Sequence, residues 1–190
     1  FDHYVARALG GVSGIIVEAT MVNNKGGIRK VDLGLYNETQ MKAFKELVDR
    51  VHGYDCKIGI QLSHAGRKAD SSYEEIIAPS PISFSNEKAP RELTKEEIKS
   101  LQTDFVNSVK LAKESGFDFV EIHGAHGYLI SQFLSPLSNQ RTDEYGGSVE
   151  NRYRFLGEIL EEIKEMDIDI HLRISANEYD EKGNSLDDII

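Results

Sequence analysis

The residues best suited to chemistry lie in one short segment, Glu121–Tyr128, which reads Glu-Ile-His-Gly-Ala-His-Gly-Tyr. It places the imidazoles of His123 and His126 and the phenol of Tyr128 at the end of an apolar run that is typical of a buried strand. Two imidazoles can hold a developing oxyanion, and a nearby phenol can deliver a proton. The alternative is structural, with one histidine bonded to the backbone and the other on the surface. Three such side chains at one strand end favour chemistry.

The elements that must position these residues alternate along the chain. Short runs rich in isoleucine and valine predict strands buried on both faces, at residues 14–20, 57–64, 117–123 and 169–175. Amphipathic periodicity predicts helices between them, at residues 4–9, 38–52, 95–115 and after residue 148. Thr94 and Glu97 have the spacing of a capping box, and Gly116 is placed to end that helix. This alternation predicts βαβ units and a parallel sheet.

Both a doubly wound sheet and an eight-stranded barrel show this alternation. Polar residues follow three different strands at the same end: His64, then His123 with His126, then Glu178 with Tyr179. A barrel gathers such residues around one mouth, and no GxGxxG motif of a dinucleotide-binding sheet follows any strand. We therefore predict a partial (β/α)8 barrel of about four consecutive βα units, which is half of the eight units of a barrel.

Composition excludes several classes of function. The net charge of -10 argues against nucleic acid, which requires a basic face. No apolar run approaches the roughly 20 residues that a membrane helix needs. The single cysteine, Cys56, rules out an internal disulfide and fits a reducing compartment, so we expect a cytoplasmic protein and an unreactive thiol.

Two connections are too long for simple turns, at residues 65–93 and 129–147. Both leave the functional end of the strands, so both are candidate substrate walls, with irregular surface structure as the alternative. Arg141, Asp143 and Tyr145 are expected to fix the second loop rather than to act in catalysis.

Three segments together resemble the old yellow enzyme family of flavin-dependent NADH:flavin oxidoreductases and ene-reductases. They are residues 61–67 (Gln-Leu-Ser-His-Ala-Gly-Arg), residues 121–128, and the stretch from Phe133 to Ser148. The likeness runs through Asn-Arg-Tyr-Arg-Phe at 151–155 and covers nearly the whole chain. The paired histidines and an Ala-Pro-Ser-Pro-Ile loop look most like the bacterial branch typified by YqjM.

The resemblance implies an FMN-binding barrel that takes hydride from NAD(P)H and reduces the C=C bond of an α,β-unsaturated carbonyl compound. By motif position, His123 and His126 would hold the carbonyl oxygen of the substrate, and Tyr128 would donate a proton to its α-carbon. We expect residues 1–190 to be a fragment of a single such barrel, truncated at both ends, and we expect the full-length parent to be a homo-oligomer.

The resemblance also implies three cofactor contacts: Ala19 through its backbone, Gln61 at the pyrimidine edge of the flavin, and Arg173 near N1 and O2. An amide within an apolar strand needs partners, and a flavin ring offers both donors and acceptors. The alternative for Gln61 is neighbouring backbone. Arg173 needs an anion or a partner, and the alternative is a buried ion pair with Glu18 or Glu121.

Two other classes of function stay open. One is a metal-dependent barrel hydrolase with His64, His123 and His126 as ligands, although this set leaves Tyr128 and Gln61 unexplained. Outside that metal set, His64 could contact the flavin or the substrate, or it could equally make a structural hydrogen bond. The other is a non-catalytic half-barrel that pairs its open edges with another chain.

Overall fold

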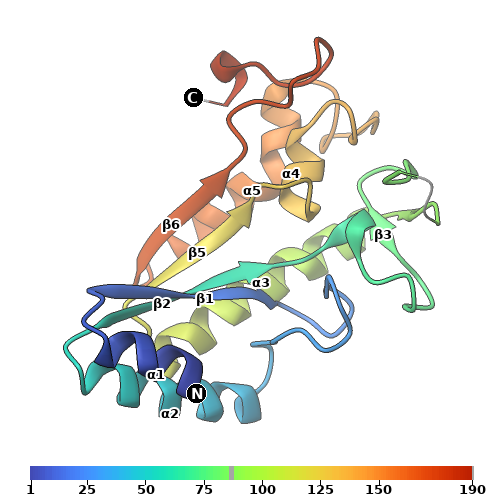
Figure 1. The fold of residues 1–190 in the computed structure, drawn as a ribbon. Helices are drawn as coiled ribbons and strands as arrows, with labels where there is room; N and C mark the ends of the chain where they lie inside the picture. Colours follow the sequence, from blue (N-terminus) through green and yellow to red (C-terminus); the bar gives the residue numbers. More distant parts are fainter. Residues whose placement is uncertain (86–87, 190) are drawn as a thin grey trace.

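A four-stranded parallel sheet forms the centre of the computed structural model, which describes residues 1–85 and 88–189 (Figure 1). Its strands are β1 (Gly14–Met21), β2 (Lys57–Ser63), β5 (Phe119–Gly124) and β6 (Asp169–Ile174). They lie in the order β1-β2-β5-β6, which is also their order along the chain. A barrel wall grows in this way, whereas a doubly wound sheet reverses its order at a switch point. The predicted α/β fold with a parallel sheet is confirmed.

The helices cover one face of this sheet. They are α1 (Asp2–Leu9), α2 (Glu38–His52), α3 (Lys95–Ser115), α4 (Leu129–Leu134) and α5 (Val149–Ile163). Figure 1 shows α3 and α5 running along the sheet. The strand residues that face them, such as Ile60, Leu62 and Ile122, are fully buried. The opposite face is open, and it carries exposed side chains such as Ile16 and Arg173.

The start and end of α3 follow the predicted capping chemistry. Thr94 Oγ1 accepts a bond from the N–H of Glu97 at 3.2 Å, and the Glu97 carboxylate accepts one from the N–H of Thr94 at 2.8 Å. Gly116 ends the helix with φ at +86°, a left-handed conformation that costs glycine little. The capping box and the helix end are both confirmed.

The two long connections contain more regular structure than the sequence predicted. The second begins with α4, where Leu129, Ile130 and Phe133 are buried against the core, so the alternative of irregular surface structure does not hold there. The first forms a 3-10 turn at Gly66–Lys68 and pairs Ile77–Ala78 (β3) with Arg91–Glu92 (β4) in a short parallel sheet. Residues 86–87 of this connection lie outside the described residues.

Two further features bear on the class of protein. Within the described part of the chain, none of the helices combines the length and the apolarity needed to cross a bilayer. Cys56 is buried, and this burial raises the pKa of its thiol and keeps it in the unreactive neutral form.

Candidate active site

Side chains from three strands meet on the open face of the sheet, near the C-terminal ends of the strands. Gln61 of β2 lies beside Glu121 of β5, and His123 of β5 lies beside Arg173 of β6. Because side chains alternate between the faces of a strand, Gln61, His123 and Arg173 all point away from the helices. The structure therefore brings together residues that are more than 100 positions apart in the sequence.

His123 is held as a neutral hydrogen-bond donor. Its side chain is 3% exposed, and its Nδ1 accepts a bond from the N–H of Ala125 at 3.3 Å. Burial, with smaller contributions from His126 and Arg173, lowers the pKa of His123 to about 4. The neutral ring then carries its proton on Nε2, since Nδ1 is an acceptor. His123 can donate this hydrogen bond to a substrate oxygen at neutral pH.

The three predicted rings form one cluster. The ring centroids of His123 and His126 are 5.0 Å apart, and those of His123 and Tyr128 are 5.1 Å apart, both with edge-to-face geometry. Burial, together with the negative charge of Asp32, raises the pKa of Tyr128 above its usual value. The phenol is therefore protonated at neutral pH and can act as an acid.

A left-handed turn links His126 to Tyr128. The φ angles are +59° at His126 and +70° at Gly127, and a non-glycine residue rarely adopts such an angle. The N–H of His126 donates to Ser175 Oγ at 3.0 Å, and Gln132 Nε2 donates to the carbonyl of Gly127 at 2.8 Å. Lys68 Nζ donates to the carbonyl of His126 at 2.9 Å. No local sequence pattern indicated these three supporting residues, Ser175, Gln132 and Lys68.

The side-chain amide of Gln61 does not bond to neighbouring backbone, which was the alternative considered for it. It is 8% exposed, and its Nε2 donates to Glu121 Oε1 at 2.5 Å, so its partner is a side chain and not neighbouring backbone. A carboxylate only accepts hydrogen bonds, which fixes the orientation of the amide. Among the described residues, the Gln61 carbonyl and its second N–H have no hydrogen bond, so both are left for another partner.

Arg173 and Ala19 also differ from ordinary strand residues. Arg173 is exposed, and across residues 1–85 and 88–189 it makes no ion pair with Glu18 or Glu121, so the alternative of a buried Arg–Glu pair is not observed. Ala19 lies where the register of β1 shifts between Val17 and Thr20. Such a bulge interrupts the ladder and leaves backbone groups for other contacts.

Comparison with known proteins identifies the family. The profile of the NADH:flavin oxidoreductase / NADH oxidase family matches residues 1–190. The chain belongs to this family. The NADPH dehydrogenases of Bacillus velezensis and Bacillus subtilis are 52% and 50% identical to it over 99% of the chain. The chain spans 56% of the length of each of these relatives.

A solved structure confirms the barrel fold. The crystal structure of Old Yellow Enzyme from Pichia sp. AKU4542 matches 98% of this chain and 53% of its own, with a TM-score of 0.89 and 33% identity. The predicted half of a (β/α)8 barrel and the resemblance to the bacterial branch of the old yellow enzyme family are thus both confirmed.

The polar groups of the open face suit the FMN of this flavin oxidoreductase family. Ser63 lies two residues after Gln61 on the same face, and its buried hydroxyl has no hydrogen-bond partner among the described residues. The Gln61 amide and the Ser63 hydroxyl lie on β2, next to the β1 strand that contains Ala19, and the Arg173 guanidinium adds donors from β6 on the same face. A flat ring with polar atoms along one edge matches this set of groups.

His64 does not join the cluster. It is 1% exposed, its Nδ1 accepts from the N–H of Gly66 at 3.1 Å, and its Nε2 has no partner within the described residues. Burial lowers the pKa of His64 to about 4. No group of three metal-ligating side chains is found in the described part of the chain, so His64, His123 and His126 are not assembled as a metal site. Of the roles considered for His64, the structure shows the structural hydrogen bond.

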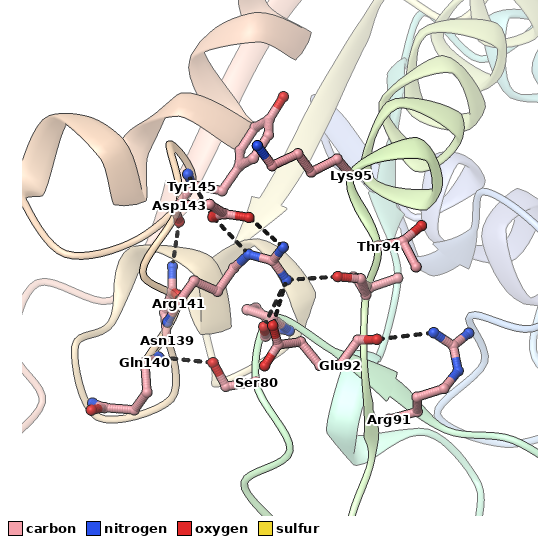
Figure 2. Close-up of polar contacts among 12 residues, drawn as sticks. Ser80, Arg91, Glu92, Thr94, Lys95, Asn139, Gln140, Arg141, Asp143 and Tyr145 are labelled. Atoms are coloured by element: carbon pink, nitrogen blue, oxygen red, sulfur yellow. Dashed lines mark hydrogen bonds and ion pairs between the residues drawn. The ribbon is translucent and has the colours of Figure 1, made fainter.

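Arg141 joins the two long connections, as Figure 2 shows. It is 7% exposed and donates to the carbonyls of Pro79 and Leu93 at 3.0 and 2.7 Å. It also forms a two-point ion pair with Asp143, with distances of 3.0 and 2.6 Å. Asp143 in turn accepts from the N–H of Tyr145 at 3.1 Å. Arg141, Asp143 and Tyr145 therefore fix the second long connection, as the sequence predicted.

Proposed function

We propose that this chain is the substrate-binding half of an FMN-dependent oxidoreductase that uses NAD(P)H to reduce the C=C bond of α,β-unsaturated carbonyl compounds. The observation that carries the proposal is the cluster of His123, His126 and Tyr128 at the C-terminal end of β5. The relatives named NADPH dehydrogenase support a nicotinamide donor. Residues 1–190 would then be a fragment of a single FMN-binding barrel.

Each residue has a separate task in this proposal. His123 and His126 donate hydrogen bonds to the carbonyl oxygen, on which negative charge develops when hydride reaches the β-carbon. Donors aimed at that charge act selectively in the transition state. Tyr128 gives its proton to the α-carbon, which completes the addition of two hydrogens across the double bond.

Cofactor binding falls to groups on neighbouring strands. The Gln61 amide would contact the pyrimidine edge of FMN, the Arg173 guanidinium would lie near N1 and O2, and Ala19 would contribute its backbone. Bound FMN would supply the hydride that the side chains cannot. The guanidinium of Arg173 would supply positive charge beside the ring when FMN is bound, which would favour its reduced form.

The test is a spectrum of the purified intact protein followed by two additions without oxygen. A yellow absorption band that NADPH bleaches, and that cyclohexenone then restores, is the expected result. A colourless protein that FMN cannot load would contradict the proposal. A protein that is reduced by NADPH but is not reoxidised by enones would keep the flavin and remove the substrate class.

A further inference from the structure

Lys68 lies next to the proposed proton donor and touches three parts of the site. It ends the Gly66–Lys68 turn that follows β2. Its Nζ donates to the carbonyl of His126 at 2.9 Å and lies 5.5 Å from the ring centroid of Tyr128. The same ammonium is 4.1 Å from the ring centroid of Phe84, in the first long connection. One side chain thus contacts an oxyanion donor, the proposed acid and a candidate substrate wall.

The contact falls where the backbone has an uncommon conformation. His126 has φ at +59°, so its peptide is held in the left-handed region by the surrounding contacts. Ser175 accepts from the N–H on one side of this residue, and Lys68 donates to its carbonyl on the other. A hydrogen bond from an ammonium is stronger than one between neutral groups. The direction of the His126 imidazole therefore depends on Lys68 and Ser175 together.

The rings on either side of Lys68 reinforce this arrangement. A cation near an aromatic face is attracted by the ring quadrupole, and Lys68 has such contacts with both Phe84 and Tyr128. Tyr128 lies two residues after His126, at the end of the same turn. Movement of the ammonium would therefore disturb the phenol as well as the imidazole.

We propose that Lys68 is a positioning residue for the proposed reaction: it fixes the His126–Tyr128 turn so that the imidazole and the phenol face the same substrate. This inference rests on the proposed function. Lys68 transfers no proton in it and acts only through His126 and Tyr128.

The test compares three substitutions in the intact, FMN-loaded protein. Lys68→Met keeps the length of the side chain and removes its charge and its donors. Lys68→Arg keeps both the charge and a donor that can stack on aromatic rings, so it should restore function. Lys42→Met is the matched control, because Lys42 is an exposed lysine of α2, far along the chain from the site, with a side chain 71% exposed.

Three measurements separate positioning from a general structural effect. Titration with para-chlorophenol, followed by its charge-transfer absorption, measures the oxyanion donors. We expect Lys68→Met to weaken the binding of para-chlorophenol about tenfold, which corresponds to the loss of one hydrogen bond. The rate of flavin reoxidation by cyclohexenone should fall about 10- to 100-fold, because small misplacements of catalytic groups are costly. Amide hydrogen exchange at Gly127 should become faster.

The outcomes distinguish this inference from the function on which it rests. A wild-type protein that reduces enones, with Lys68→Met unchanged in phenol affinity and reoxidation rate, would overturn the inference and leave the function intact. Equal losses in Lys68→Met and Lys68→Arg, with a lower Tm in both, would also overturn it. A wild-type protein with flavin but no enone turnover would overturn both. Full rescue by Lys68→Arg, with Lys42→Met unaffected, supports the inference.

Discussion

His64 and His123 each accept a backbone N–H bond at Nδ1, from Gly66 and Ala125 respectively. In both cases the donor is two residues further along the chain, beyond the end of the strand. The bond fixes the same tautomer in both rings, with the proton on Nε2. The two histidines differ in what Nε2 faces: His64 is enclosed by the fold, whereas His123 lies in the ring cluster. The same local geometry therefore serves structure in one case and the proposed chemistry in the other.

Tyr128 is the residue whose role can be tested most directly. In Tyr128→Phe the ring still packs against His123, but its proton is gone. General acids contribute typically 10²–10⁴ in rate, so we expect cyclohexenone to reoxidise the flavin about 10²-fold more slowly, with reduction by NADPH retained. Stopped-flow absorbance measures both half-reactions. An unchanged reoxidation rate would show that another group supplies the proton.

Glu121 orients the amide of Gln61, so its replacement should be felt by the cofactor. Glu121→Gln replaces an acceptor with an amide that can also donate, and Gln61 is then free to turn over. We expect the Kd for FMN to rise about tenfold, which is the difference between a charge-assisted and a neutral hydrogen bond. Flavin fluorescence quenching measures this Kd. Glu18→Gln is the control, because it removes an exposed carboxylate from the neighbouring strand without touching Gln61.

The sequence predicted the reactive side chains better than their supports. His123, His126 and Tyr128 are within six positions of one another, so their spacing alone could indicate a shared site. The supports are distant: Lys68 contacts His126 across 58 positions, and Ser175 contacts it across 49. No local sequence pattern indicates which of the loops at the strand ends will lie side by side. Their positions depend on the curvature of the sheet.

At the scale of elements, hydrophobic periodicity in the sequence predicted the long helices but not the short one. The 21 residues of α3 repeat their apolar face several times, and both ends carry local capping signals. The six residues of α4 complete fewer than two turns, so no repeat could reveal this helix. Its polar Gln132 was a usable signal, since a fully buried amide in an apolar run must bond to something.

Arg141 determines how the two long connections hold together, and its loss should be costly. Arg141→Met leaves the buried carbonyls of Pro79 and Leu93 without their donor and Asp143 without its ion pair. Removing one partner of a buried ion pair costs about 3–5 kcal/mol, and we expect a loss near the lower end because Asp143 is partly exposed. Urea unfolding, followed by circular dichroism, measures this loss.

Arg50 provides the matched comparison for Arg141. It forms an exposed ion pair with Glu46, four residues away on α2. Pairs of this kind contribute about 0.3–0.5 kcal/mol, so Arg50→Met should barely change the free energy of unfolding. Similar losses in both variants would mean that Arg141 does not join the connections as its contacts indicate.

At the scale of the whole molecule, the candidate chemistry is confined to one face and one end of the sheet. The groups proposed to contact FMN and substrate come from β1, β2, β5, β6 and the loop after β5. The helix-covered face is closed by residues such as Ile60 and Ile122, and the beginnings of β2 and β5 are joined by Asp118, which accepts from Lys57 and from the N–H of Ile58. Stability and proposed function thus occupy opposite ends of the same strands, as is usual in barrels.

The buried histidines make the stability of the whole fold depend on pH. The folded state binds a proton at His64 only near pH 4, whereas the unfolded chain binds it near pH 6.5. The stabilising effect of the neutral ring is therefore complete above pH 6.5 and declines as the pH falls from 6.5 towards 4. The decline is about 1.4 kcal/mol per pH unit for one histidine, or on the order of 2 kcal/mol between pH 6.5 and pH 5. The pKa of His123 is lowered similarly, so it adds to the decline.

His64→Asn isolates the contribution of one ring. The Asn oxygen can accept the N–H of Gly66 in place of Nδ1, but it takes up no proton. We expect the variant to be less stable at neutral pH, because a smaller side chain leaves a cavity, and to have a shallower pH dependence than the wild type between pH 6.5 and 5. Urea unfolding at several pH values in this interval measures the slope, and the contribution of the carboxylates cancels in the comparison because both proteins carry the same ones. Parallel slopes in the two proteins would show that His64 is already protonated in the folded state, which its burial without a second partner should forbid.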